Sequence, residues 1–253
     1  MNFCRIAMAS VAVAACALMT GCAQDTPKSV FQNSEEYSAR VFVPSVLSSS
    51  VRETASDSKP MPFSKITLTR SAKVMEQGTL IDFSADVTYE NAGQGLVREI
   101  DVGYKNGVEE NRQFNLSYRG LLALHEQDIR STYHSTYQKM PYTLTVSSLS
   151  HFDSSFDQPN LSYVYRMSSD NPRYKSVDRS LACTMTRTYA GSKLAAGISG
   201  NVREFECKFY NDNGVVDTNS TYVYLDDYGV AVLKQMVRTE MKVYWTISNF
   251  KAG

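Results

Sequence analysis

Hydrophobic and polar side chains alternate residue by residue in many short stretches of this 253-residue chain. Such alternation is typical of strands with one buried face and one wet face, and it predicts an antiparallel sheet. From about Pro62 to Phe250 we therefore expect a mainly β fold, built as a sandwich, a curved sheet or a half-barrel. The alternating stretches are 81–89, 99–105, 114–118, 142–146, 181–186, 205–209 and 241–247.

Two Asn-Gly pairs mark tight turns between these stretches. Asn106-Gly107 and Asn213-Gly214 supply the positive backbone angles that short hairpins need. The segment 120–137 is ambiguous, because its three leucines from Leu121 to Leu124 fit a short helix as well as a strand or a loop. At most one short helix is therefore expected after residue 61.

The two halves of the chain repeat landmarks in the same order. Val97-Arg98-Glu99-Ile100 recurs as Val202-Arg203-Glu204-Phe205, and each copy is followed by an Asn-Gly turn. We interpret this as a duplication that gives two related meanders, 62–150 and 151–253, forming one compact unit with 147–160 as the connection. Convergence is the alternative, since amphipathic hairpins share one pattern.

Cys183 and Cys207 form an even pair in the second half. An exported protein keeps such pairs oxidised, so a disulfide is expected, with two buried free thiols as the alternative. By the offsets between the copies, Cys183 corresponds to Phe83 and Cys207 to Val102. We therefore expect these positions to face each other across a hairpin in both copies.

The first 22 residues have the order of a secretory signal. Asn2 and Arg5 precede an apolar run from Ile6 to Met19, which is shorter than the roughly 20 residues that span a bilayer. Its end, Leu18-Met19-Thr20-Gly21-Cys22, resembles the lipobox of bacterial lipoproteins. Over residues 1–22 the resemblance implies cleavage before Cys22, a lipid such as palmitate on that cysteine, and export to the cell envelope.

Two other interpretations of this segment remain open. One is an ordinary cleaved signal with an incidental cysteine, and the other is an earlier lipobox at Val13-Ala14-Ala15-Cys16. Within the lipoprotein class, Ala23 after the cysteine implies sorting to the outer membrane. Residues 22–61 are rich in Ser, Asp, Glu and Pro, so we expect a flexible tether that holds the folded part away from the membrane, or a plain disordered terminus.

Charge and motif content exclude several kinds of chemistry. Lys plus Arg and Asp plus Glu are both 26, so the chain has no basic footprint for nucleic acid. The three histidines lack a zinc-site spacing, and we expect no metal, no cofactor and no catalytic residue. His125-Glu126-Gln127-Asp128 is expected to be a solvated loop or helix face. A cleft that gathered Asp153, Asp157, His151 and His125 would reverse the expectation of no catalysis.

Tyrosines recur in pairs on two of the predicted strands. Tyr163 and Tyr165 share one face of their strand, as do Tyr222 and Tyr224. They form either a ledge for a glycan, a lipid or a partner protein, or part of the hydrophobic core.

The functional hypothesis that follows is a non-catalytic envelope lipoprotein, held by its N-terminal lipid at the periplasmic face of the outer membrane. It would bind or scaffold an envelope protein, a lipid or a glycan. One alternative is a lipid or lipoprotein carrier with an apolar concave sheet, which resembles periplasmic lipoprotein-handling proteins in broad architecture. Another is an enzyme that acts on cell-wall glycan.

Overall fold

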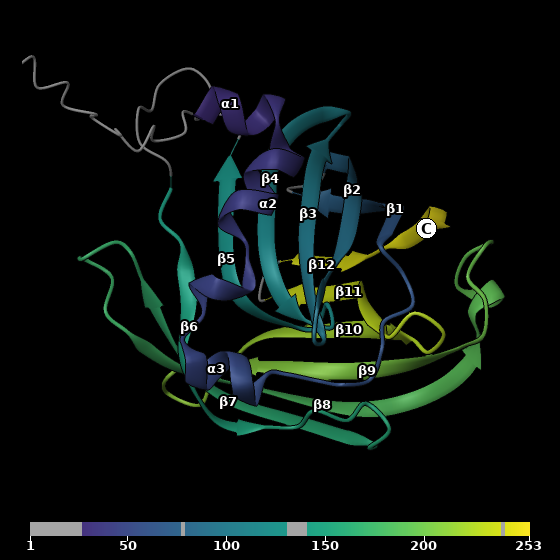
Figure 1. Cartoon of the computed structure of the whole chain (residues 1–253). Helices are drawn as coiled ribbons and strands as arrows, with labels where there is room; N and C mark the ends of the chain where they lie inside the picture. Colours follow the sequence, from purple (N-terminus) through teal and green to yellow (C-terminus); the bar gives the residue numbers. More distant parts are fainter. Residues whose placement is uncertain (1–26, 77–78, 131–140, 239–240) are drawn as a thin grey trace, which may run out of the picture.

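The computed structural model describes residues 27–76, 79–130, 141–238 and 241–253. Within these residues the structure is mainly β, and thirteen strands form one antiparallel sheet in chain order, with β13 paired to β1 at the end (Figure 1). This confirms the expected fold class. The strands are β1 (Lys65–Glu76), β2 (Thr79–Gly93), β3 (Leu96–Lys105), β4 (Val108–Tyr118), β5 (Leu122–Arg130), β6 (Leu144–Phe152), β7 (Asn160–Ser169), β8 (Val177–Ala190), β9 (Asn201–Tyr210), β10 (Val216–Leu225), β11 (Val230–Arg238), β12 (Met241–Tyr244) and β13 (Thr246–Ala252).

The sheet curls into a nearly closed barrel. In Figure 1, β1–β5 stand roughly upright and β7–β11 run across beneath them. β12 pairs with β11 at one edge of the sheet, whereas β13 pairs with β1 at the other edge. The prediction of one continuous strand over 241–247 is therefore wrong. The chain leaves one edge at Trp245, whose backbone N–H donates to Lys234 O at 2.8 Å, and joins the opposite edge.

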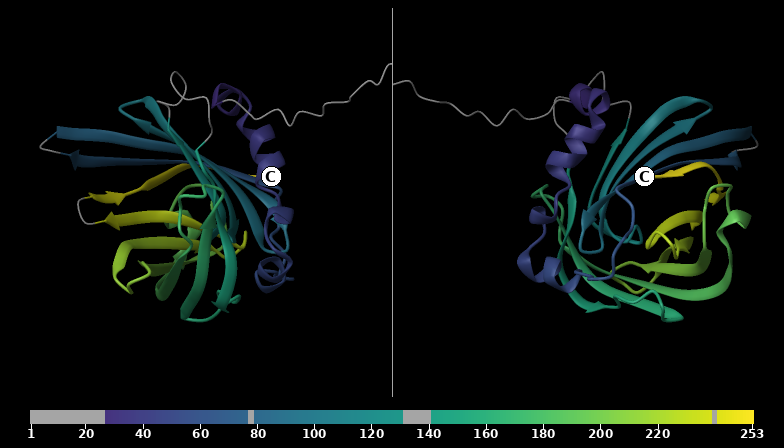
Figure 2. Two further views of the ribbon diagram at one scale, coloured as in Figure 1. Left: turned by 90° about the vertical axis from the view of Figure 1, so that its left-hand side faces the viewer. Right: turned by 45° about the vertical axis from the view of Figure 1, so that its right-hand side comes forward.

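The up-and-down order places the turns alternately at two ends of the barrel. The end at which β1, β3, β5, β7, β9 and β11 finish is called rim A, and its described turns are 106–107, 170–176 and 211–215. The end that carries the turns at 94–95, 119–121, 153–159, 191–200 and 226–229 is called rim B. Figure 2 shows several hairpins of rim A projecting to the same side of the molecule, on the left of its left-hand view.

Four short helical segments precede the sheet: α1 (Pro27–Gln32), α2 (Ser34–Val41), the 3-10 helix η1 (Pro44–Val46) and α3 (Ser49–Thr54). α1 and α2 lie along one face of β3–β5, where the ring of Tyr37 contacts Phe114 with centroids 5.0 Å apart, and α3 packs against β6. Val30, Phe42 and Val51 are almost completely buried. The predicted flexible tether is therefore wrong for residues 27–61, because α1, α2 and α3 bury apolar side chains that are spaced among the polar ones. Residues 22–26 lie outside the described part.

A second group of apolar side chains fills the barrel toward rim B. Val97 in β3 and Val202 in β9, equivalent residues of the two proposed copies, are each the second residue of their strand and share this core. The duplication itself stays a prediction. The proposed connection between the copies is wrong in part, because β6 extends to Phe152 and only the loop 153–159 joins β6 to β7.

The turns and the disulfide follow the expected chemistry. Asn106 and Gly107 both have positive φ, at 51° and 77°, and close a two-residue hairpin. Gly214 also has positive φ, at 73°, in a longer turn. Cys183 and Cys207 are directly paired on β8 and β9 and form the predicted disulfide.

The equivalent positions of the first copy do not oppose each other. Phe83 pairs with Lys105, and Val102 pairs with Asp86. That part of the prediction is wrong, because a short turn joins β2 to β3 while the longer loop 191–200 joins β8 to β9, so the two hairpins have different registers. The ambiguous segment after Gly120 forms the strand β5 as far as Arg130, and its remainder lies outside the described residues.

Candidate functional site

The barrel encloses a cavity of about 570 Å³ between β2–β5 and β7–β12. A cavity of this size is typical of sites that hold one small molecule. Its walls combine apolar and charged side chains. The apolar wall includes Phe83, Leu144, Phe209, Met236, Met241 and Trp245, all of them only partly buried.

Strand periodicity explains how charged side chains reach this interior. On β4, Gln113 and Asn115 line the cavity, while Phe114 between them packs against the helices. On β5, Glu126 lines the cavity, while its neighbour His125 faces the ring of Phe42, with centroids 4.9 Å apart. Both faces of these strands are therefore covered, one by the helices and one by the opposite wall of the barrel.

His125 is thus not part of a solvated loop or helix face, as the sequence led us to expect. Its side chain is buried, its Nδ1 lies 2.8 Å from the Thr145 hydroxyl, and burial lowers its pKa. The buried Gln127 likewise accepts a hydrogen bond from the Tyr37 hydroxyl at 2.5 Å. The prediction failed because the covering helices belong to the segment that was interpreted as a tether.

One ion pair is buried in the cavity wall. The Arg70 guanidinium donates from Nη2 to Asp101 Oδ2, and its central carbon lies 5.4 Å from the centroid of the Trp245 ring. Burial raises the pKa of Asp101, and the charge of Arg70 opposes that rise. Because the two opposite charges neutralise each other, this pair leaves the other carboxylates of the wall to determine the sign of the interior.

Glu99 is the carboxylate with the most unusual environment. Its Oε2 accepts a hydrogen bond of 3.3 Å from the Asn115 amide, and no Lys or Arg among the described residues lies within ion-pair distance. Burial, and next the negative charge of Asp101, raise its pKa to about 7. Glu99 therefore changes its charge near neutral pH.

Glu126 is a second carboxylate of the interior. Burial raises its pKa, and the positive charges of Arg179 and Arg238 oppose the rise. Like Glu99, it makes no ion pair within 4 Å in the described part of the chain. The interior thus presents two carboxylates that no protein cation neutralises by direct contact.

The cavity opens at rim A. The exposed members of its wall lie on the parts of the strands that are nearer to rim A. They are Glu110, Gln113, Asp128, Asp217 and Arg238. Toward rim B the same interior is filled by the apolar core around Val97 and Val202.

The four predicted tyrosines divide between the cavity and the core. Tyr165 and Tyr222 line the cavity. Tyr163 and Tyr224 are fully buried, and Tyr224 stacks on Phe156 with ring centroids 4.2 Å apart. Half of the proposed ledge is therefore available to a ligand.

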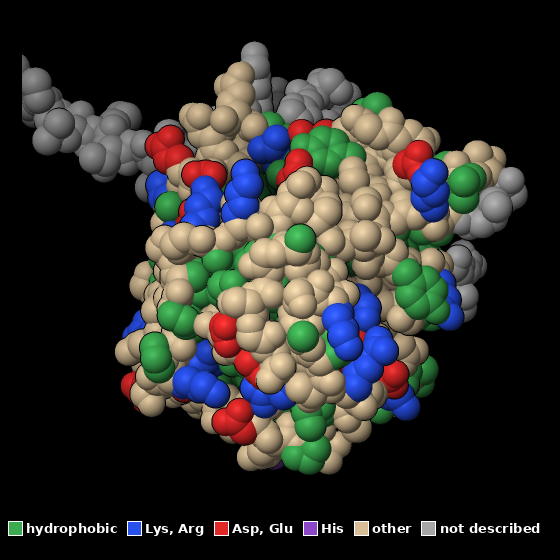
Figure 3. Space-filling model, turned by 90° about the vertical axis from the view of Figure 1, so that its right-hand side faces the viewer, with side chains coloured by type: hydrophobic (Ala, Val, Ile, Leu, Met, Phe, Trp, Pro, Cys, Tyr) green, Lys and Arg blue, Asp and Glu red, His purple; other side chains and the backbone are tan. Residues whose placement is uncertain are grey.

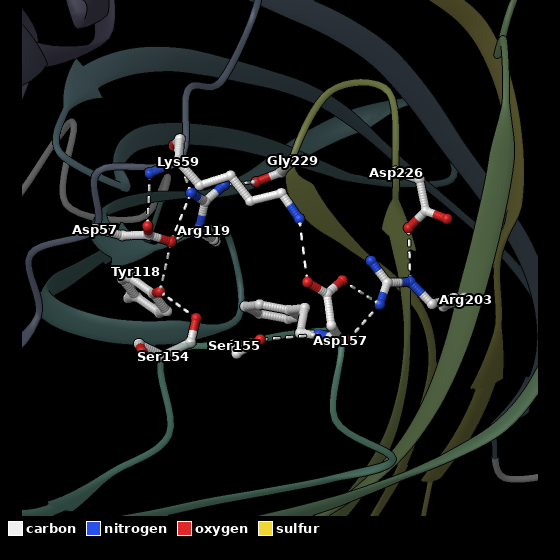
Figure 4. Close-up of polar contacts among 11 residues, drawn as sticks. Asp57, Lys59, Tyr118, Arg119, Ser154, Ser155, Asp157, Arg203, Asp226 and Gly229 are labelled. Carbon is white, nitrogen blue, oxygen red and sulfur yellow. Dashed lines mark hydrogen bonds and ion pairs between the residues drawn. The ribbon is translucent and has the colours of Figure 1, made fainter.

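Rim B carries a polar network instead (Figure 4). The buried Arg119 donates to Asp57 Oδ2, to Lys59 O and to Gly229 O at 2.6–2.9 Å. Beside it, Arg203 pairs with Asp157 and Asp226. Asp157, Arg119 and Ser155 are among the residues that line a small hollow of about 100 Å³. Every carboxylate of this network that Figure 4 shows is engaged by a cation.

The proposed catalytic cluster is not assembled. His151 lies 3.5 Å from Asp153, but Asp157 is bound to Arg203. His125 is buried elsewhere, between Thr145 and the ring of Phe42. No group of three or more metal-binding side chains occurs among the described residues. Within the same residues, no helix is long and apolar enough to cross a membrane.

No protein-family model matches the chain, and no curated protein matches it. The structure is similar to the crystal structure of a DUF1329 family protein from Desulfovibrio piger, with a TM-score of 0.35 and 10% sequence identity. The match covers 76% of this chain and 86% of that chain.

Proposed function

We propose that this protein is a non-catalytic envelope lipoprotein that holds one amphipathic molecule in the barrel cavity. The observation that carries the proposal is the cavity wall itself, where partly exposed apolar side chains stand beside carboxylates without ion-pair partners. An apolar chain would lie against Phe209, Met236 and Trp245, and a polar end would reach Glu99 or Glu126. Burial of the chain would supply most of the affinity.

The charge of the wall indicates which polar end fits. Six acidic residues line the cavity against three arginines, and one of those arginines, Arg70, is already paired with Asp101. An anionic headgroup would therefore meet carboxylates whose charge opposes it. A hydrogen-bond donor, such as an ammonium or a hydroxyl group, is the better partner for Glu99 and Glu126.

The localisation in this proposal rests on the lipobox-like sequence that ends at Cys22. Two or more acyl chains on that cysteine would hold the protein stably on a membrane. Because α1 begins at Pro27, only residues 23–26 would separate the helices from a lipid on Cys22. A carrier of amphiphiles near a membrane surface is consistent with this arrangement.

Trp245 gives a direct test, because it is the one tryptophan of the chain and it lines the cavity. A long-chain amine, the matching alcohol and the matching carboxylate should be titrated while the Trp245 emission is recorded. We expect a saturable change with the amine or the alcohol and a weaker response with the carboxylate. Emission that responds to none of the three would reject the proposal.

Two alanine variants separate cavity binding from surface binding. Ala123 lines the cavity, whereas Ala182 is exposed on β8. Ala123→Phe should fill the site and abolish the saturable change, while Ala182→Phe should bind as the unaltered chain does. Equal binding by both variants would place the ligand outside the cavity.

A further inference from the structure

Exposed apolar side chains gather at rim A. Eight large hydrophobic residues are exposed in the described part of the chain. Five of them lie at or beside rim A: Leu80, Val108, Tyr142, Val215 and Val216. Val108 is 70% exposed at the very tip of the β3–β4 hairpin, so this clustering is not a by-product of partial burial. Figure 3 shows hydrophobic side chains on the corresponding right-hand edge of the molecule.

These side chains belong to separate hairpins rather than to one continuous patch. Leu80 is the second residue of β2, Val108 begins β4, and Val216 begins β10, so polar backbone and side chains separate them around the rim. A rigid protein partner favours a contiguous apolar patch that it can cover. A fluid surface accepts each tip independently, and that is the property of a lipid bilayer.

The charged side chains of the rim are of both signs. Exposed bases such as Arg173 and Lys175 share it with exposed acids such as Asp170 and Asp212. Lys105 lies with its Nζ 5.8 Å from the centroid of the Phe83 ring, an arrangement of amphipathic side chains that suits the boundary between water and lipid. Attraction to a surface would therefore come from apolar insertion and depend only weakly on salt.

We infer that rim A docks on a lipid bilayer surface, with the apolar hairpin tips inserted among the headgroups around the mouth of the cavity. The inference rests on the proposed function in one respect, since the mouth at this rim would then face the source of an amphipathic ligand. Docking at the rim is also a separate contact from any acyl chain on Cys22, because residues of the β-hairpins make it.

The first test compares two matched double variants of the full chain, each carrying Cys22→Ser so that no acyl chain is attached. Val108→Ser with Val215→Ser alters rim A, and Val46→Ser with Val164→Ser alters exposed valines elsewhere. Flotation with phosphatidylethanolamine–phosphatidylglycerol vesicles should show about a tenfold weaker partition for the rim variant, as expected for losing two inserted apolar side chains. The control variant should float as the Cys22→Ser chain does.

The second test locates the contact. With Trp245→Phe as background, a tryptophan is placed at rim A by Val108→Trp or on β7 by Val164→Trp, and vesicles with brominated acyl chains are added. Quenching of Val108→Trp alone supports docking, because insertion of about 5–10 Å reaches the acyl boundary. Docking would be overturned by equal flotation of both serine variants or by the absence of quenching at Val108→Trp. It would also be overturned if rim A instead mediated the pairing of two copies of the chain.

The outcome is separable from that of the proposed function. The Trp245 titration without vesicles reports cavity binding alone, and the Val108→Ser, Val215→Ser variant should still bind the amine or the alcohol. If the chain with an unaltered rim floats with vesicles but binds none of the three ligands, and the rim variant floats less, the carrier is rejected and the docking rim is kept. The reverse result would reject the docking rim and keep the carrier.

Discussion

Arg119 and Asp57 join the N-terminal arm, residues 27–61, to the barrel through an ion pair, with the buried Arg119 Nη2 2.6 Å from Asp57 Oδ2. Asp57 follows α3, and Arg119 stands in the turn between β4 and β5. Arg119 also holds Gly229 O, in the turn that leads to β11. One guanidinium therefore connects the arm, the first half of the sheet and the second half.

Replacement of Asp57 by Asn should lower the free energy of unfolding by about 3 kcal/mol, because it leaves the buried Arg119 charge without its counter-ion. Asp82→Asn provides the matched control, since its pair with Lys73 is exposed and worth under about 1 kcal/mol. Urea denaturation of both variants measures the difference. Similar small losses would show that the pair does not hold the arm.

The same carboxyl group predicts an acid dependence. Burial by itself would raise the pKa of Asp57, but hydrogen bonds from the Lys59 backbone N–H and from Arg119, with the charge of Arg119, lower it. Its contribution to stability is present above its ordinary pKa near 4 and is lost as pH falls through the lowered value. Between pH 5 and 2, the Asp57→Asn variant should therefore lose less stability than the unaltered chain.

The Cys183–Cys207 disulfide closes a segment with a sequence separation of 24. Loop-closure entropy gives it about 3 kcal/mol of stabilisation. The double variant Cys183→Ala, Cys207→Ala should unfold at correspondingly lower urea, and reductant should shift the unaltered chain alone. If reductant shifts both proteins equally, the effect has another origin.

Much of the fold was predictable because it depends on local chemistry. Alternation along β2, β3, β4, β8 and β9 predicted the antiparallel sheet. Asn106-Gly107 predicted the two-residue hairpin, and the Cys183–Cys207 pair predicted the disulfide. The N-terminal helices were missed because they are short and polar in composition, so their few apolar residues gave no sustained helical period.

The site was less accessible to sequence reasoning. Glu99 and Asp101 alternate with apolar residues on β3 and were interpreted as the wet face of that strand. Curling of the sheet turns that face inward, and helices cover the other face. The segment's own pattern cannot distinguish solvent from a cavity, because both accept charged side chains. Arg70, which forms the ion pair with Asp101, belongs to no sequence motif that would have pointed to the site.

Glu99 predicts an opposite pH dependence to that of Asp57. Its pKa is raised from about 4.5 to about 7, so the protonated form is favoured in the folded chain. Its contribution is fully present below about pH 4.5 and is lost as pH rises through 7. From pH 5 to 8 the unfolding free energy of the unaltered chain should therefore fall by about 2–3 kcal/mol relative to that of Glu99→Gln, which cannot titrate at this position.

Asn115→Leu gives a second measurement of the Glu99 environment. The Asn115 amide donates to the carboxylate and so lowers its pKa. Removing that donor should move the Glu99 midpoint above 7 in a titration followed by carboxyl-selective NMR. A midpoint that stays in place would mean that the amide does not contact the charged form.

The central claim is that the cavity holds a single amphipathic molecule, and native mass spectrometry of protein purified gently from its own host tests it most directly. We expect one additional mass beyond the processed chain, which organic solvent releases and which the Ala123→Phe variant lacks. The released molecule should carry an apolar chain with an ammonium or hydroxyl group. A chain without added mass, or a mass that Ala123→Phe retains, would show that the cavity does not hold such a molecule.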